Sequence, residues 1–228
     1  MGAGGEALSG REGTGVLSSL AKPIFDYQPG RLMNPFAMTK VLLTAALFTV
    51  TCGPLIAAPV EFDIDPTHTY PSFEADHMGI SVWRGKFDKS SGKVTLDREK
   101  GTGTVEVTID LDSVNFGLPV MNSWARGMDL FDTERFPAAV FRGKLEGFTH
   151  GIPKEAVGTL SLHGVTKLMT LKINQFKCIL HPLHKRELCG TDAIATFNRD
   201  EYGLDAGKSY GFKMEVTLRI QVEAVATK

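Results

Sequence analysis

The sequence lacks an apolar run long enough to cross a bilayer as a helix. Its most apolar stretch, VLLTAALFTV at residues 41–50, has ten residues, whereas a hydrocarbon core needs about 20. The sequence also has no large excess of positive or negative residues, since 25 Lys and Arg nearly balance 26 Asp and Glu. No long basic run appears either, so we expect neither an integral membrane protein nor a nucleic-acid partner.

Motifs of the common enzyme classes are missing as well. The chain has no G-x-S-x-G elbow, no H-E-x-x-H helix and no glycine loop that would cradle a phosphate. Asp129, Asp132 and Glu134 are candidates for a carboxylate pair in acid/base chemistry. They alternate with Arg126 and Arg135, however, which is the pattern of a solvated helix face. We therefore expect no catalytic residues and no cofactor.

The first part of the chain has the pattern of an export signal. Residues 1–37 show no sustained period, and we expect a disordered extension or an over-call of the start codon. Residues 38–57 combine Lys40, a short apolar core and small residues after a helix breaker, which is typical of a secretory signal peptide cleaved after Ala57. We expect a periplasmic protein, with secretion from the cell as the alternative.

Residues 58–228 form one predicted domain that is rich in strands. Val105, Val107, Ile109 and Leu111 alternate with polar residues, and residues 212–224 continue the same alternation for longer. Turn signals recur about every ten residues, including a predicted hairpin turn at 89–92. The phase slips near Asn174, which predicts a β-bulge. Eight or so strands of this kind fit an antiparallel barrel, with a sandwich as the alternative.

The alternation stops once, in a segment that predicts a short helix at about 121–131. Trp124, Met128 and Phe131 are spaced by four and three residues, so they would share one helix face. Pro137 then breaks the helical period before a further strand. We expect this apolar helix to cap one end of the barrel.

Two cysteines and two histidines lie close together near residue 180. Cys178, His181, His184 and Cys189 have zinc-ligand chemistry and spacing. In an oxidising compartment, however, two cysteines that flank a hairpin more often form a disulfide. Pro182 also restricts the convergence of the histidines. We therefore predict a Cys178–Cys189 disulfide and no metal.

Several short motifs occur in a characteristic order along residues 61–225. They are Phe73-x-x-x-His77, Phe131-Asp132, Phe136-Pro137, Leu162-His163-Gly164-Val165-Thr166-Lys167 and Arg199-x-x-x-Gly203. With these motifs the chain resembles the YceI-like family of bacterial polyisoprenoid-binding proteins. The resemblance implies a lipocalin-like antiparallel barrel, export, and an apolar tunnel that holds an isoprenoid or similar lipid as carrier or store. Leu168, where such proteins often carry proline, and the hairpin at residues 178–189 depart from the family pattern.

The inward phase of the strands and the predicted helix supplies candidate ligand contacts. Aromatic and thioether side chains suit a featureless hydrocarbon, although each alone is more often plain core. The candidates for the tunnel wall are Phe73, Trp124, Met128, Phe131, Phe141, Phe197, Met214 and Leu218. The alternative function is a small barrel hydrolase or isomerase that acts on a lipid-like substrate. Visits to a membrane surface and a homodimer through an edge strand are further expectations.

Three polar residues are candidates for contact with a ligand head group. Arg199 shares its strand face with small residues, and a buried cation requires a partner. We favour a structural ion pair with Asp132 or Asp129 over a head-group phosphate. His77 and His163 are the other two candidates, although a satisfied structural histidine is the commoner outcome.

The cysteine interpretation predicts the result of a thiol assay. Mature protein that is denatured without reductant should react with no thiol reagent, because Cys178 and Cys189 are both oxidised. Reduction before denaturation should release two thiols and serves as the control. Two free thiols in the unreduced sample would contradict the disulfide and favour zinc.

Overall fold

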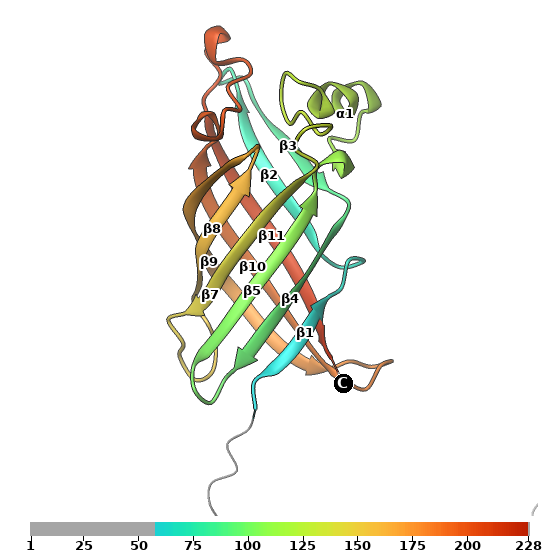
Figure 1. Ribbon diagram of the computed structural model, residues 1–228, viewed down its shortest axis with the longest axis vertical. Helices are drawn as coiled ribbons and strands as arrows, with labels where there is room; N and C mark the ends of the chain where they lie inside the picture. The colour runs from blue at the N-terminus through green and yellow to red at the C-terminus, as the bar shows by residue number, and fades with distance from the viewer. Residues whose placement is uncertain (1–57, 228) are drawn as a thin grey trace, which may run out of the picture. The chain divides into compact units, whose positions relative to one another are not determined.

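A computed structural model describes residues 58–227, and it shows a closed antiparallel barrel with a short helix at one end (Figure 1). The predicted eight-stranded barrel is confirmed. Eight strands pair in the cyclic order β1-β4-β5-β7-β8-β9-β10-β11, and β11 returns to β1. Their bounds are β1 Val60–Ile64, β4 Ser90–Asp97, β5 Thr102–Asp110, β7 Ala138–Glu146, β8 Glu155–Leu162, β9 Val165–Leu180, β10 Glu187–Asn198 and β11 Glu215–Ala226.

Three further strands extend one end of the barrel. These are β2 (Tyr70–His77), β3 (Ser81–Phe87) and the two-residue β6 (Val114–Asn115). β11 pairs with β1 over its last residues and with β2 over its first half, so β1 and β2 occupy one place in the sheet in succession. β3 pairs with β2 and β6, and its Ser81–Gly85 stretch has a partner on one side alone among the described residues.

The predicted hairpin turn at 89–92 is wrong, because the chain bends there without reversing. β3 and β4 do not pair with each other, and β4 pairs with β1 and β5 instead. Gly92 is needed for packing within β4, since a Cβ at this position would lie 2.0 Å from the Glu106 carbonyl oxygen. Gly92 therefore permits the close approach of two strands and does not mark a turn.

The predicted β-bulge is confirmed. Asp192 pairs with Gln175 and Ala193 pairs with Ile173, so Asn174 is the extra residue in β9. The bulge restores the inward phase of the residues that follow, as the slip in the sequence required.

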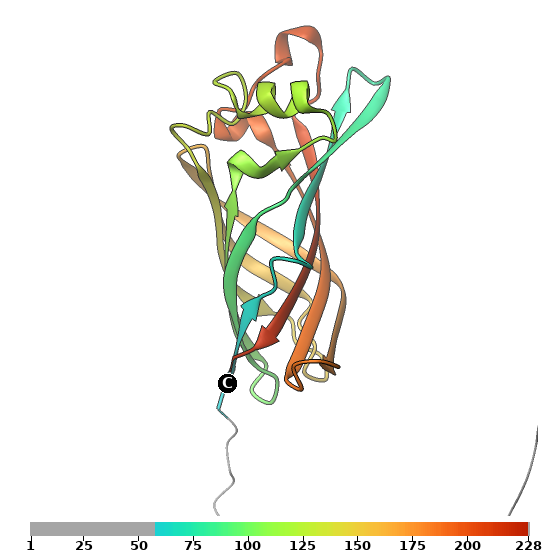
Figure 2. The same cartoon turned by 90° about the vertical axis from the view of Figure 1, so that its right-hand side faces the viewer.

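The helix is shorter than the sequence predicted. α1 spans Pro119–Arg126, with proline in its first turn, where the missing N–H costs no helical hydrogen bond. The Gly127 N–H bonds the Trp124 carbonyl and ends the helix, so Met128 and Phe131 lie in the turns that follow. α1 lies across the end of the barrel that carries the β2–β3 hairpin, called here the helix end (Figure 2).

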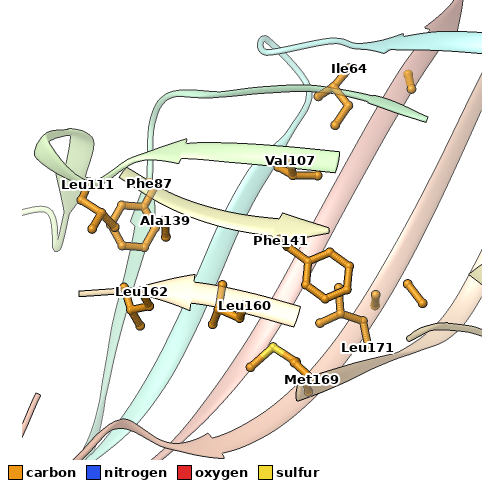
Figure 3. Close-up of a cluster of buried hydrophobic side chains, with 14 of the residues drawn as sticks. Ile64, Phe87, Val107, Leu111, Ala139, Phe141, Leu160, Leu162, Met169 and Leu171 are labelled. Atoms are coloured by element: carbon orange, nitrogen blue, oxygen red, sulfur yellow. The ribbon is translucent and has the colours of Figure 1, made fainter. Parts of the chain in front are cut away.

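The opposite end carries the β9–β10 hairpin and is called here the hairpin end. Large inward side chains fill the interior toward this end, and several of them pack together in Figure 3. Phe62, Leu96, Phe141 and Leu171 are all buried. The hairpin end is therefore an ordinary close-packed core.

The signal-peptide prediction for 38–57 and the extension predicted for 1–37 lie outside the described residues. Within the described part of the chain, no helix has the length and apolarity that a bilayer crossing demands.

A buried threonine joins the two strands that share one place beside β11. Thr69 precedes β2 and is 0% exposed. Its hydroxyl donates to the Glu223 carbonyl at 3.2 Å and accepts from the Glu223 N–H at 3.1 Å. The side chain thus replaces a strand backbone where the chain passes from β1 to β2.

This arrangement makes the Thr69 hydroxyl important for stability. Thr69→Val keeps the shape but leaves the Glu223 N–H without its partner, so unfolding free energy should fall by about 1–3 kcal/mol. Urea unfolding followed by tryptophan fluorescence measures the change. Thr95→Val removes an exposed hydroxyl pair with Thr104 and is the control. Equal losses in the two variants would contradict the role given to Thr69.

A candidate ligand cavity at the helix end

The helix half of the barrel encloses a cavity of about 740 Å³. Its wall comes from β2, β3, β5, β7, β8, β10 and β11, and from the loops around α1 and η3 (Lys208–Tyr210). Apolar side chains dominate this wall, and Trp124, Met128 and Tyr210 lie at its open side. The packed hairpin half forms the floor, and the exposed lining residues lie at the helix end, so the cavity opens there.

One side of the cavity is built from aromatic rings. Phe73 is central, with ring centroids 5.6 Å from Phe87 and 5.4 Å from Phe116. Phe131 lies 5.5 Å from Phe87, and Trp83 lies 6.3 Å from Phe212. Most of these pairs meet edge to face, which is a favourable geometry for aromatic rings. The cluster presents a rigid apolar wall to the cavity.

Six of the eight residues predicted for the tunnel wall line this cavity. They are Phe73, Trp124, Met128, Phe131, Phe197 and Leu218. Phe141 and Met214 are not in the lining. Phe141 is buried one level deeper, in the core below the floor, and Met214 is half-buried where the chain enters β11. Contact of any of these residues with a ligand stays a prediction.

Arg199 lines the cavity, but the expected ion pair with Asp132 or Asp129 is absent from the described residues. Its Nη1 and Nη2 donate to the carbonyls of Leu204 and Ala206, each at 2.5 Å. Asp132 pairs with Arg135 instead, at 3.2 Å. Burial lowers the pKa of the Arg199 guanidinium, although nearby Asp200 and Asp205 oppose the shift. Backbone carbonyl oxygens thus take the place of the expected carboxylate as hydrogen-bond acceptors. These two bonds hold the loop that follows Arg199.

Neither histidine is in the cavity lining, and each has local partners. His77 stacks on Trp83 with ring centroids 4.1 Å apart. His163 lies in the β8–β9 turn, where its Nδ1 is 3.1 Å from the Tyr202 carbonyl and its ring packs on Phe136. Both side chains brace loops at the helix end, and contact with a head group stays a prediction.

The predicted disulfide joins Cys178 and Cys189 in the structure. The two residues are directly opposite each other in the β9–β10 ladder. His181 uses its Nδ1 to accept the N–H groups of Leu183 and His184, each at 3.1 Å. Because oxidised sulfur offers no thiolate and His181 is used within the turn, this set is not arranged as a zinc site.

Five aromatic residues of the cavity wall were not predicted from the sequence. These are Trp83, Phe87, Phe116, Tyr210 and Phe212. Trp83 and Phe87 are two strand positions on either side of Gly85, so alternation along β3 was a usable signal. Phe116 and Phe212 lie outside the long strands, where alternation has no predictive value.

The charged residues of the cavity lining lie near its open side. Asp76, Asp129, Arg199 and Asp205 lie among the loops there. The hydrogen-bonded pair of His68 and Asp65, 2.7 Å apart, lies elsewhere, at the β1–β2 connection. The arrangement suits an elongated apolar molecule with a polar end near the opening.

Comparison with known proteins agrees with this geometry. The model of the YceI-like domain matches residues 62–224. A UPF0312 protein of Pseudomonas aeruginosa is 28% identical over 191 residues, which cover 82% of this chain and 96% of that protein. A UPF0312 protein of Yersinia enterocolitica is 29% identical over 143 residues, covering 60% of this chain and 71% of that protein.

Solved structures share the fold. A polyisoprenoid binding domain from Saccharophagus degradans has a TM-score of 0.54 and 20% identity, covering 74% of this chain and 99% of that one. The YCEI protein of Campylobacter jejuni has a TM-score of 0.56 and 21% identity, covering 67% of this chain and 90% of that one. At these identities the similarity establishes the barrel architecture.

The Phe73 ring offers a test of the cavity. A Cβ on Gly85 would lie 2.4 Å from the tip of this ring, so Gly85→Ala should push the ring into the cavity. Overpacking of this kind costs about 1–3 kcal/mol, and we expect affinity for a fluorescent fatty acid to fall about tenfold. Adding Phe73→Leu should restore binding. A folded Gly85→Ala protein with unchanged affinity would contradict the placement.

Proposed function

Because the chain belongs to the YceI-like domain family, we propose that it is an exported lipid-binding protein that holds a long apolar chain in its barrel. The ligand class is a polyisoprenoid or similar molecule, such as an isoprenoid quinone, a prenyl phosphate or a fatty amide. The protein would act as a carrier or store. The observation that carries this proposal is the apolar cavity of about 740 Å³ at the helix end.

The size of the cavity limits the part of a ligand that it can hold. At about 30 Å³ per carbon-sized group, 740 Å³ holds roughly 25 groups, or about five isoprene units. Each CH₂ removed from water contributes about 0.8 kcal/mol, so a chain of this length needs few polar contacts. A longer isoprenoid would extend through the opening.

The polar groups near the opening support a ligand with a polar end. Arg199 places a guanidinium beside the apolar wall, and Asp76, Asp129 and Asp205 lie in the same rim. A quinone ring or another hydrogen-bonding end group placed here would meet these groups while its tail lies deeper. This polarity gradient supports binding of an amphipathic lipid.

Two further parts of the proposal concern location and assembly. The Cys178–Cys189 disulfide supports export, because disulfides persist in oxidising compartments such as the periplasm. The one-sided pairing of Ser81–Gly85 supports a homodimer through this strand, since an unpaired edge is a template for a second strand.

Co-purification tests the ligand. Protein isolated from the periplasm of a bacterial host should carry a lipid in native mass spectrometry, and delipidated protein should take up an added prenyl lipid. Leu218→Arg places a charge in the wall and should abolish uptake, whereas Thr217→Arg on the opposite strand face should not. Ligand-free spectra together with no uptake by the wild-type protein would contradict the proposal.

A further inference from the structure

Exposed apolar side chains are concentrated at the helix end. Eight of the fourteen large apolar residues that are exposed in the described chain belong to three segments there. These segments are the β2–β3 hairpin, the α1 region and η3 (Figures 1 and 2). We call this set the apolar collar: Met78, Ile80, Val82, Leu118, Val120, Trp124, Met128 and Tyr210.

The collar is continuous with the cavity. Trp124, Met128 and Tyr210 belong to both, since each lines the cavity and is also exposed to solvent. The remaining members lie outside the lining, and Ile80 and Val120 are 77% and 67% exposed. Because the hairpin half of the barrel is packed, a ligand that enters the cavity passes the collar.

The charges beside the collar do not favour an anionic partner. Lys208 pairs with Asp200 at 2.7 Å, Lys213 is 3.9 Å from Asp76, and Arg126 is 3.7 Å from Asp112. The loop tips themselves, Met78-Gly79-Ile80 and Leu118-Pro119-Val120, carry no charge. The attraction of this surface is therefore apolar.

We propose that the apolar collar docks on the surface of a lipid bilayer, so that the ligand passes between the bilayer and the cavity without crossing water. This inference rests on the proposed lipid-binding function. A bilayer fits the collar better than a protein partner because the collar residues lie on three separate segments and three of them also line the open side of the cavity. Trp124 and Tyr210 also have the amphipathic rings that are enriched at membrane interfaces.

Direct passage removes a large kinetic barrier. Every CH₂ that moves from a bilayer into water costs about 0.8 kcal/mol, so free diffusion of a long isoprenoid is very slow. An opening pressed against the bilayer keeps the chain in an apolar environment throughout. The collar thus supplies the route that a deep, one-ended cavity requires.

Sedimentation with phosphatidylcholine vesicles tests the docking. The triple variant Ile80→Ser, Leu118→Ser, Val120→Ser removes apolar tips outside the cavity lining, and we expect its vesicle partition coefficient to fall about tenfold or more. Raising the ionic strength from about 0.05 M to about 0.5 M should change wild-type binding little, because the attraction is apolar.

The control is a matched variant with two exposed leucines away from the collar. Leu180 and Leu183 in the β9–β10 hairpin region at the hairpin end are 68% and 81% exposed, so Leu180→Ser, Leu183→Ser removes comparable side chains. This variant should bind vesicles as the wild type does. Docking through the collar would be overturned if this control variant lost vesicle binding as strongly as the triple variant. It would also be overturned if the wild-type protein bound only vesicles that contain anionic lipid.

A second measurement separates this inference from the proposed function. The triple variant should retain wild-type affinity for a short prenyl lipid added in detergent, because the cavity wall is intact. Its rate of lipid uptake from vesicles should fall together with vesicle binding. Normal uptake from vesicles by a triple variant that no longer binds them would overturn the inference. So would a wild-type protein that takes up lipid in detergent but binds no protein-free vesicle, and this result would leave the proposed function standing.

Discussion

Closure of the sheet is the constraint on which the rest of the structure depends. The pairing of β11 with β1 completes eight strands, and a barrel of this size has an interior whose width is fixed by strand number and tilt. Such an interior either fills with side chains or holds one small ligand. The size of the inward residues at each level therefore decides between core and cavity.

The interior is filled with side chains in one half of the barrel and left partly open in the other. Near the hairpin end, Phe62, Phe141 and Leu171 meet across the interior and fill it. Near the helix end, the small residues Ala75 and Ala139 line the cavity and leave room in the middle, and the larger rings of Phe73 and Phe131 lie against the wall. The interior of one half is thus packed, and the interior of the other half is free to bind a ligand.

The strands were predictable because the alternation of apolar and polar residues is a direct consequence of one wet and one dry face. The bulge at Asn174 followed from the same rule, since one extra residue was the simplest way to keep inward residues inward. The turn predicted at 89–92 failed because Gly92 allows close contact between β4 and β5, and a glycine in the sequence does not distinguish such a contact from a turn.

The cavity was less predictable than the barrel. Phe141 and Leu218 both point inward, yet Phe141 lies below the floor and Leu218 lies above it. The level of a residue along the barrel depends on register between strands, which alternation within one strand does not specify. Arg199 illustrates the same limit, because its partners are carbonyls of a loop whose path depends on three-dimensional packing.

The joint at Thr69 has a consequence for how such proteins diversify. β2 pairs with the first half of β11 and carries β3 on its other side. β1 pairs with the end of β11 and with β4, and this pairing closes the hairpin half of the barrel. Insertions or exchanges in residues 70–87 can therefore reshape the open side of the cavity while the hairpin half of the barrel stays intact. New ligand preferences can arise in this lineage by splicing one short segment, with no redesign of the barrel.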